Sequence, residues 1–360
     1  MEKLYTAALL HFLPFGPRSN ARLFAHFGSA EAIWKASNDQ LRLSGIEEKP
    51  LSAFTAWRQA HKPQELFEKI TKLNLEVIAR TDERYPKALN TIYDPPLGFF
   101  LMGNLPDPFT PLVSIVGSRD CTGYGIKIAQ SLASDLAAQG IGVVSGGARG
   151  IDEYAHLAAA KTGYTLAVLA QGHTDLASRH RNLVQVILKN GGGIISEYPP
   201  STEGLSFRYP IRNRLIAGLS RGTVVIEAKI ASGSLITAQA AIEAGREVFA
   251  VPGPIDSPSS EGTNRLIKDG AHVVTCAADI NEALNLHLPQ PLSHKNTPTA
   301  VPVGDTPIEQ TIIQHLTQGP LHIDQLARAS SHSLAELLTA LTYLEMAGKV
   351  RGLGNMEYGL

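Results

Sequence analysis

The chain has 360 residues, of which 44% are hydrophobic, with 32 basic and 33 acidic residues and a net charge of −1. This is an ordinary globular composition with room for two or three domains, and it carries no overall charge signature of a nucleic-acid partner. We expect a cytoplasmic protein without membrane insertion, metal or cofactor: no apolar run approaches the roughly 18 residues that cross a bilayer, no signal peptide is evident, and the two cysteines lack metal-ligand spacing.

Residues 1–70 are predicted to form a helical domain. Apolar residues recur at helical spacing over Leu4–Phe12 and Ala21–Phe27, and glycine-containing turns lie at 13–18 and 43–46. Two interpretations are open: helix-hairpin-helix modules whose backbone amides contact phosphate, or a domain whose helices only pack together. Residues 71–110 are rich in proline turns and are expected to form a connecting segment packed on the core, with one candidate strand at Val77–Ala79.

Two successive strand–turn–helix units are the strongest signal in the chain. Buried strands are predicted at Val113–Val116 and Ile141–Val144, and each leads through a glycine turn into a helix. The turns contain Gly117, Ser118 and Arg119 in the first unit, and Gly146, Gly147 and Arg149 in the second. Exposed amides, a helix N-terminus and a guanidinium together favour an anion, although glycines that merely make tight turns are the alternative. Neither the dinucleotide nor the nucleoside-triphosphate fingerprint is present.

Further strands alternate with helices up to about residue 285. They are predicted at Thr165–Leu169, Ile194–Glu197, Thr223–Glu227, Glu247–Val251 and Ala271–Thr275. We therefore predict an α/β fold for residues 111–285, an extended Rossmann-like, doubly wound and mostly parallel sheet that binds its ligand at the carboxyl ends of the strands.

A basic segment precedes the strand at Thr223–Glu227. Residues 204–226 contain four arginines and no acidic residue, and aromatic residues alternate with the arginines. Guanidinium groups that neutralise phosphates and rings that stack on bases can hold a single strand with little sequence preference. The candidate residues for this role are Phe207, Arg212, Asn213 and Arg214. In the alternative interpretation, Arg212 and Arg214 pair with Glu197 and Glu227 at neighbouring strand ends.

Catalytic combinations can also be drawn from the sequence. Asp152 and His156 could form a nucleophilic set with one of the loop serines, but no Gly-x-Ser-x-Gly elbow is present; these serines are Ser145, Ser232 and Ser234. Asp152 is expected to be a helix cap or a first-turn acid, and His156 a packed residue. Glu197 and Glu227 could form an acid/base pair, or could orient the arginines.

The C-terminal part is predicted to be a linker followed by a winged-helix domain. Residues 286–306 are proline-rich and nearly uncharged. Residues 307–360 show helical patterns at Ile308–Leu316, Ile323–Ala329 and Leu334–Ala347, followed by two short strands. Residues 306–360 have three basic and five acidic residues, a net charge of −2 that would repel duplex phosphate, so we expect this domain to contact protein.

These motifs resemble the DprA (Smf) family of DNA processing proteins. The resemblance covers about residues 80–285 and rests on Ile115–Arg119, Ser145–Asp152, Tyr209–Ile216, Ser232–Thr237, Val251–Gly253 and Gly262–Ile267. It implies a non-enzymatic protein of natural transformation that binds and protects incoming single-stranded DNA, forms a homodimer and loads the RecA recombinase for homologous recombination. The winged-helix domain could then meet other competence proteins.

The resemblance also implies individual roles. The DNA pocket would use Ser118, Arg119, Gly146, Gly147, Arg212, Asn213 and Arg214. One departure is that Ser178-Arg179 stands where the family usually has Tyr-Pro, although Arg179 and Arg181 keep this segment basic. The dimer surface would include Asn264, Leu266, Ile267, Ala271 and Val273.

A different function is implied by a second resemblance of the fold, to the lysine-decarboxylase-like phosphoribohydrolases, which process nucleotides. Those enzymes need a Pro-Gly-Gly-x-Gly-Thr-x-x-Glu turn, and this chain has Ala231–Thr237 there instead. The substitution removes the expected catalytic glutamate.

Overall fold

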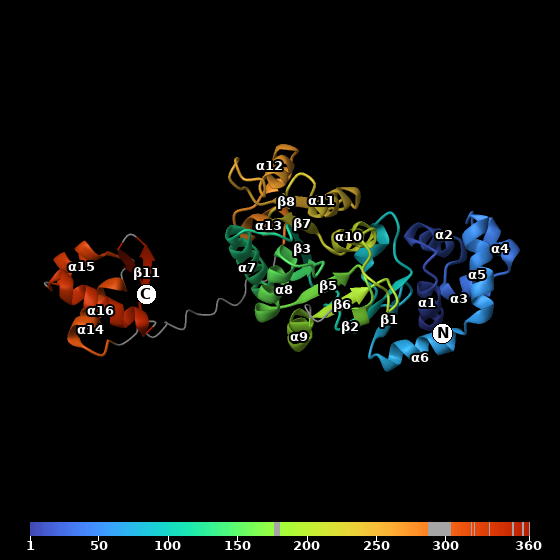
Figure 1. Cartoon of the computed structure of the whole chain (residues 1–360), viewed down its shortest axis with the longest axis horizontal. Helices are drawn as coiled ribbons and strands as arrows, with labels where there is room; N and C mark the ends of the chain where they lie inside the picture. Colours follow the sequence, from blue (N-terminus) through green and yellow to red (C-terminus); the bar gives the residue numbers. More distant parts are fainter. Residues whose placement is uncertain are drawn as a thin grey trace. The chain divides into compact units, whose positions relative to one another are not determined.

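A computed structural model describes residues 1–175, 181–286, 304–317, 319, 321–330, 332–347, 349–354 and 356–359. The chain divides into two compact units, Met1–Leu288 and Pro289–Leu360 (Figure 1). Among the described residues, no helix combines the length and apolar character that crossing a bilayer requires.

Six helices occupy residues 1–72, all of which are described. They are α1 (Glu2–His11), α2 (Pro17–Phe27), α3 (Ala30–Lys35), α4 (Asn38–Leu43), α5 (Glu48–Ala60) and α6 (Pro63–Lys72). Local sequence sets several boundaries: α2 begins at a proline and ends before Gly28 in the left-handed conformation, and the hydroxyl of Ser29 caps α3. Leu9, Leu23 and Phe54 lie in the core that these helices enclose.

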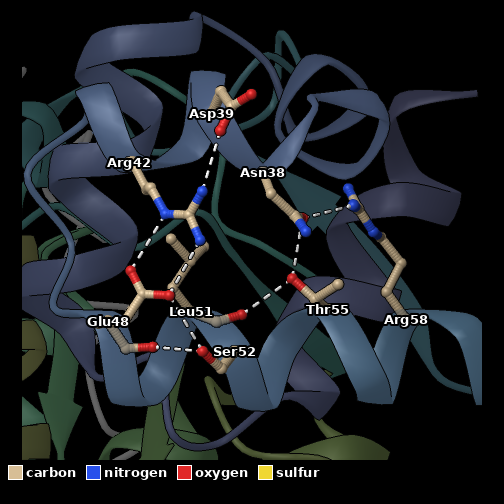
Figure 2. A network of polar contacts seen from close by, with 8 residues as sticks. All are labelled: Asn38, Asp39, Arg42, Glu48, Leu51, Ser52, Thr55 and Arg58. Atoms are coloured by element: carbon tan, nitrogen blue, oxygen red, sulfur yellow. Dashed lines mark hydrogen bonds and ion pairs between the residues drawn. The ribbon is translucent and has the colours of Figure 1, made fainter.

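The second glycine turn of this region, between α4 and α5, is held by polar contacts (Figure 2). The Arg42 guanidinium donates to Asp39 at 2.9 Å and to both carboxylate oxygens of Glu48 at 3.1 Å. The Thr55 hydroxyl donates to the Asn38 side-chain oxygen at 2.9 Å. These contacts favour helix packing as the role of this turn, because its guanidinium and both carboxylates are engaged with one another.

A nine-stranded sheet forms the centre of the first unit. Its order is β1-β2-β6-β5-β4-β3-β7-β8-β9, and every neighbouring pair from β6 to β9 is parallel. The strands are β1 (Glu76–Ala79), β2 (Gly98–Gly103), β3 (Leu112–Val116), β4 (Gly142–Ser145), β5 (Thr165–Leu169), β6 (Gly193–Ser196), β7 (Gly222–Val225), β8 (Glu247–Ala250) and β9 (His272–Val273). Chain order runs outward from β3 through β4 to β6, then returns and runs outward from β7. The switch point of a doubly wound sheet therefore lies between β3 and β7.

Helices cover both faces of the sheet, as the sequence predicts (Figure 1). They are α7 (Gly123–Ala138), α8 (Ile151–Thr162), α9 (Arg181–Lys189), α10 (Arg208–Leu219), α11 (Gly233–Glu243), α12 (Glu261–Lys268) and α13 (Ala277–Ala283), with short 3₁₀ turns at Lys87–Thr91 and His173–Asp175. Val113 and Ile115 of β3 join the core formed with α7 and α8. Leu112 and Val116 join the core formed with α10 and α11. This alternation is what a strand buried on both faces produces.

The proline-rich segment 71–110 contributes more than a connection, because it supplies β1 and β2. Both pair antiparallel, β1 with β2 and β2 with β6. Val77 and Phe100 pack into the core of the N-terminal helices, whereas Ile78 and Phe99 pack into the core under α10. The hairpin therefore lies between two cores and joins them in one compact unit.

The second unit has a core and a sheet of its own. Its elements are α14 (Pro307–Leu316), β10 (Leu321–His322), α15 (Ile323–Ser330), α16 (Leu334–Met346), β11 (Arg351–Gly354) and β12 (Glu357–Gly359). The strands form an antiparallel sheet in the order β10-β12-β11. Three helices with a small sheet match the predicted winged-helix layout, to which the structure adds β10. Of the predicted linker, residues 287–303 lie outside the described part of the chain.

Candidate functional site

A cavity opens at the switch point, where β3 and β7 end. Its volume is about 470 Å³, and its lining includes Gly117, Arg119, Tyr209, Arg212, Asn213 and Ser232–Ser234. We call it the crevice. A second cavity of about 370 Å³ adjoins it and is lined by Gly146, Gly147, Arg149 and residues of α9. Arg119 and Tyr209 line both, so this pair of side chains marks their common boundary.

The Arg119 guanidinium lies over the ring of Tyr209, with its central carbon 5.0 Å from the ring centroid. Such a cation–π contact orients the guanidinium while leaving its N–H groups available. Arg119 is exposed, and within the described part of the chain it forms no ion pair. An arginine held in place by stacking, without a carboxylate partner, is suited to bind an anionic ligand.

The two glycine turns touch each other. The Ile151 amide, at the start of α8, donates to the Ser118 carbonyl at 3.2 Å. Gly150 has φ +91°, and a Cβ placed there would lie 2.4 Å from the Ser118 carbonyl oxygen and 2.7 Å from that of Arg119. Only glycine permits this approach, so the second turn supports the backbone from which Arg119 projects.

Arg212 supports the second turn from inside. It is 4% exposed, and it donates to the Gly146 carbonyl at 2.7 Å and to the Val168 carbonyl. The Asp152 carboxylate accepts the Gly146 amide at 3.1 Å. Burial lowers the pKa of Arg212 to about 10, and nearby Asp152 opposes that shift, so the guanidinium is charged at neutral pH. Arg212 thus holds the turn while it also lines the crevice.

Asn213 lines the crevice, whereas Ser118 lies in the neighbouring turn, outside the lining. The Asn213 amide donates to the Gly233 carbonyl at 3.4 Å, which links α10 to the start of α11. The Ser118 hydroxyl accepts the Asp120 amide at 3.2 Å and closes the first turn. Both side chains are largely buried, so their polar atoms shape the backbone around the crevice.

Arg214 does not line the crevice. Its guanidinium pairs with Glu197 at 2.5 Å and with Asp94 at 3.5 Å, and all three side chains are less than one fifth exposed. These contacts correspond to the ion-pair alternative for Arg214, so its guanidinium is engaged within the fold and is not available as a DNA contact. Glu227 forms no ion pair with an arginine of the described residues. It accepts the Thr122 amide at 2.9 Å and the Thr122 hydroxyl at 2.6 Å, at the start of α7.

Ser145, Asp152 and His156 lie close together, but their polar groups are engaged within the fold and are not arranged as a nucleophile and its base. The Ser145 hydroxyl donates to the Ile115 carbonyl at 2.6 Å, and His156 Nδ1 lies 2.7 Å from the Thr165 hydroxyl. His156 is fully buried, and burial lowers its pKa to about 3. Asp152 is in the first turn of α8. The predictions of a first-turn acid and a packed histidine are confirmed. Among the described residues, no group of three or more potential metal ligands is present.

The remaining basic and aromatic candidates lie around the crevice rather than in it. Arg149 pairs with Asp120 on the surface, where ion pairs are weak and readily exchanged. Arg181 is exposed at the start of α9, and Arg179 lies outside the described residues. Phe207 is exposed but lines a different cavity, on the other side of α10.

Sequence reasoning therefore missed Tyr209 as the aromatic residue of the crevice. The signal was available: in a helix, residues three and four apart share a face, so Tyr209, Arg212 and Asn213 belong together. The alternation of aromatic and basic residues along the segment favours Phe207 as the aromatic residue of the site instead. The run from 208 to 219 forms the helix α10, which decides between these groupings.

The residues predicted for the dimer surface lie on α12, on the edge strand β9 and, for Ala271, directly before that strand. Leu266 and Ala271 are partly buried against the core under α10 and α11. The Asn264 side chain exchanges hydrogen bonds with the amide and carbonyl of Gly253. Ile267 is partly buried, whereas Val273 is exposed on the unpaired edge of the sheet. Val273 is therefore the most accessible of the five.

Comparison with known proteins gives matches along most of the chain. Residues 76–285 match the family described as DNA recombination-mediator protein A, and residues 296–356 match the DprA winged helix domain. Protein Smf of Escherichia coli is 34% identical over 325 residues, which cover 88% of this chain and 87% of that protein. DNA processing protein DprA of Streptococcus pneumoniae is 42% identical over 200 residues, covering 55% of this chain and 71% of that protein.

Two solved structures share the fold. DNA processing protein A of Streptococcus pneumoniae has a TM-score of 0.67 at 33% identity, covering 78% of this chain and 95% of that one. The protein from Helicobacter pylori has a TM-score of 0.51 at 27% identity, covering 59% of this chain and 95% of that one. The latter structure is described as giving insights into the single-stranded DNA binding mode of the Helicobacter pylori protein.

Proposed function

The chain belongs to the family of the DNA recombination-mediator protein A, and from this premise we propose that it binds single-stranded DNA in the crevice. The observation that carries the proposal is the stacked pair Arg119–Tyr209, at the boundary of two adjoining cavities. A guanidinium without an acidic partner and an aromatic ring beside it are the two groups that bind a single strand without reading its sequence.

The strand backbone runs across the two glycine turns. Arg119 contacts a phosphate, and Tyr209 stacks against a neighbouring base. Arg212 adds to the positive potential in the crevice, because its side chain is buried in the lining and yet protonated. Each phosphate contact, that of Arg119 included, should add about −0.7 to the slope of log affinity against log salt.

Single-stranded DNA fits these features better than a duplex. Stacking on Tyr209 requires a base with a free face, and bases in a duplex are already stacked on their neighbours. The binding groups also lie inside cavities, which an unpaired strand can enter.

The larger role that we propose is that of the family: the protein acts in natural transformation without catalysing a reaction. It protects the incoming strand and loads the RecA recombinase onto it for homologous recombination. Association of two subunits through the face near α12 and β9 places two crevices on one strand and raises avidity without new contacts.

A competition experiment tests the proposal. A labelled single-stranded oligonucleotide is bound to the protein at two salt concentrations, and unlabelled single strand or duplex of the same sequence is added. We expect single strand to displace the probe at much lower concentration than duplex. Equal competition by duplex would contradict single-strand recognition.

The same preparation distinguishes the nucleotide-processing alternative. It is incubated with nucleoside monophosphates, and release of free base is followed. The engagement of Glu197 with Arg214 and of Glu227 with Thr122 supports the expectation that no base is released. If the protein released free base and did not bind oligonucleotides, the nucleotide-processing function would replace the proposed one.

A further inference from the structure

A third cavity, of about 200 Å³, lies on the side of α10 that faces away from the crevice. It is bounded by the N-terminal helices, with Leu13, Phe15 and Asn20 on one side and Tyr198, Phe207 and Ile211 on the other. We call it the α2/α10 cavity. We propose that it binds one unpaired nucleobase of the strand that occupies the crevice, so the inference rests on the proposed function and adds a second subsite to it.

The walls of this cavity suit a flat aromatic ligand. Leu13 and Phe207 are large hydrophobic side chains that remain exposed, Phe207 at 58%. The Arg208 guanidinium lies between two rings, 5.1 Å from the centroid of Tyr198 and 5.3 Å from that of Phe207. Because this stack orients the Phe207 ring, a base can stack against it with little loss of side-chain freedom.

Asn20 supplies an unused acceptor in the lining. The side chain is 8% exposed, and its amide donates to the Phe15 carbonyl at 3.2 Å. Its Oδ1 atom is buried and has no hydrogen-bond partner among the described residues. An unpaired buried acceptor is costly, and the exocyclic amino groups of adenine, cytosine and guanine are donors that would satisfy it. Thymine lacks such a group.

The charges around the cavity do not oppose a nucleic acid. Glu197 is the acidic residue in the lining, and the Arg214 guanidinium pairs with it. Arg208 adds a positive charge beside Phe207. The first turn of α10 contains no acidic residue. The local charge is therefore favourable for a phosphodiester chain that passes nearby.

The linings of the two sites come close together at the start of α10. Ser206 and Tyr209 line the crevice, while Phe207 and Arg208, in the same turn, line the α2/α10 cavity. A strand leaving the crevice reaches the second site by crossing this single turn. The N-terminal region would then contribute to DNA binding through the side chains of its first glycine turn, which complete a base pocket, and not through backbone amides that contact phosphate.

A length series tests the subsite. Oligothymidylates of increasing length are titrated with the wild-type protein, with Phe207→Ala, and with Phe109→Ala as the control. Phe109 is an equally bulky exposed aromatic residue, in the loop before the amino end of β3. We expect Phe207→Ala to weaken binding of long oligonucleotides roughly 5- to 100-fold, as loss of one stacked base would. Short oligonucleotides that fill only the crevice should bind normally, and the salt slope should not change because no phosphate contact is lost.

A fluorescent base locates the contact. A single 2-aminopurine is moved along an oligothymidylate, and its quenching is measured with each protein. We expect one position to be quenched by the wild type but not by Phe207→Ala. Cytosine at that position should bind more tightly than thymine, and Asn20→Leu should abolish this difference. Normal binding of the short oligonucleotide shows that each variant is folded.

The outcomes separate the two proposals. If the wild type binds no oligonucleotide, the proposed function itself fails. If Phe207→Ala binds every length as the wild type does, or loses affinity equally at every length, the subsite is refuted while single-strand binding in the crevice stands.

Discussion

Three arginines near the carboxyl ends of the strands differ in what their guanidinium groups contact. Arg119 stacks on Tyr209 and is exposed. Arg212 is buried and donates to backbone carbonyls. Arg214 is buried against two carboxylates. The same residue type therefore supplies an exposed guanidinium for the proposed ligand contact, a turn support and a structural ion pair. Exposure separates Arg119 from the other two, and the partners within reach separate Arg212 from Arg214.

Replacing Arg119 with alanine should weaken single-strand binding for all sequences alike. One phosphate contact is lost, so the salt slope should become shallower by about 0.7. The measurement is a titration of two unrelated oligonucleotides at several salt concentrations. Arg221→Ala is the matched control, because Arg221 is also exposed but lies just before the amino end of β7. A loss confined to one oligonucleotide sequence would contradict backbone recognition.

Buried His156 should make the folded protein sensitive to acid. Its pKa is about 3 in the folded state, because burial disfavours the charged ring, and about 6.5 when unfolded. Between these values the unfolded chain binds a proton that the folded chain does not. The free energy of unfolding should therefore fall by up to about 1.4 kcal/mol per pH unit as pH drops from 6.5 towards 3.

Urea unfolding at pH 7.5 and pH 5.5 measures this effect. His156→Gln should reduce the difference between the two midpoints, whereas His26→Gln, at an exposed position, should leave it unchanged. Buried His173 has a pKa lowered to about 4 and contributes in the same direction, so the His156 variant retains part of the pH dependence. An unchanged difference in His156→Gln would refute the assignment.

At the residue scale, the sequence predicts that the site binds an anion, but it predicts less well which individual side chains line the site. The glycine turns indicate where Arg119 lies, because a turn after a parallel strand has only one edge of the sheet to occupy. The roles of Arg212 and Arg214 depend on partners such as Asp94, which is 120 residues away in the chain from Arg214. Local spacing carries no information about such a contact.

At the element scale, most helices and parallel strands are predictable, because the helices have apolar residues at helical spacing and the strands are short apolar runs between turns. The hairpin β1–β2 is harder, since β2 is buried on both sides over most of its length and shows no alternation of polar and apolar residues. The helix α10 is obscured for a related reason. It is buried around most of its circumference and includes buried arginine and asparagine, so it lacks an amphipathic pattern.

Because the two glycine turns contact each other, a substitution in the second turn should affect both stability and the position of Arg119 in the first. Gly150→Ala should destabilise the protein by more than the roughly 1–3 kcal/mol of left-handed strain, because its Cβ would collide with the carbonyls of Ser118 and Arg119. Single-strand binding should weaken as well, since the Arg119 turn must move. Gly140→Ala is the control: Gly140 has φ +80° with nothing within 4 Å of the added Cβ. Thermal unfolding and oligonucleotide titration of both variants measure the effects, and equal behaviour of the two would refute the turn–turn contact.

At the scale of the whole molecule, the two units differ in what they offer to a nucleic acid. The first contains the crevice and its arginines. The second buries Leu337, Leu341 and Leu344 of α16 in its own core. The exposed residues of that helix include Glu336, Thr339 and Thr342. A helix with this face lacks the basic residues that a phosphate backbone requires, which favours the expectation that the second unit contacts protein.

Removing residues 290–360 should therefore leave single-strand binding intact. The first unit has its own cores and forms a compact body up to Leu288, so the truncated protein should fold. Its affinity and salt slope for a single-stranded oligonucleotide should equal those of the full chain, because all the proposed phosphate contacts remain. If recruitment of a protein partner is the task of the second unit, the truncated protein should bind DNA normally yet fail in natural transformation. The truncated protein could instead lose DNA affinity while the thermal unfolding of the first unit stays unchanged. That result would place part of the DNA site in the second unit and contradict the assignment of DNA binding to the first unit alone.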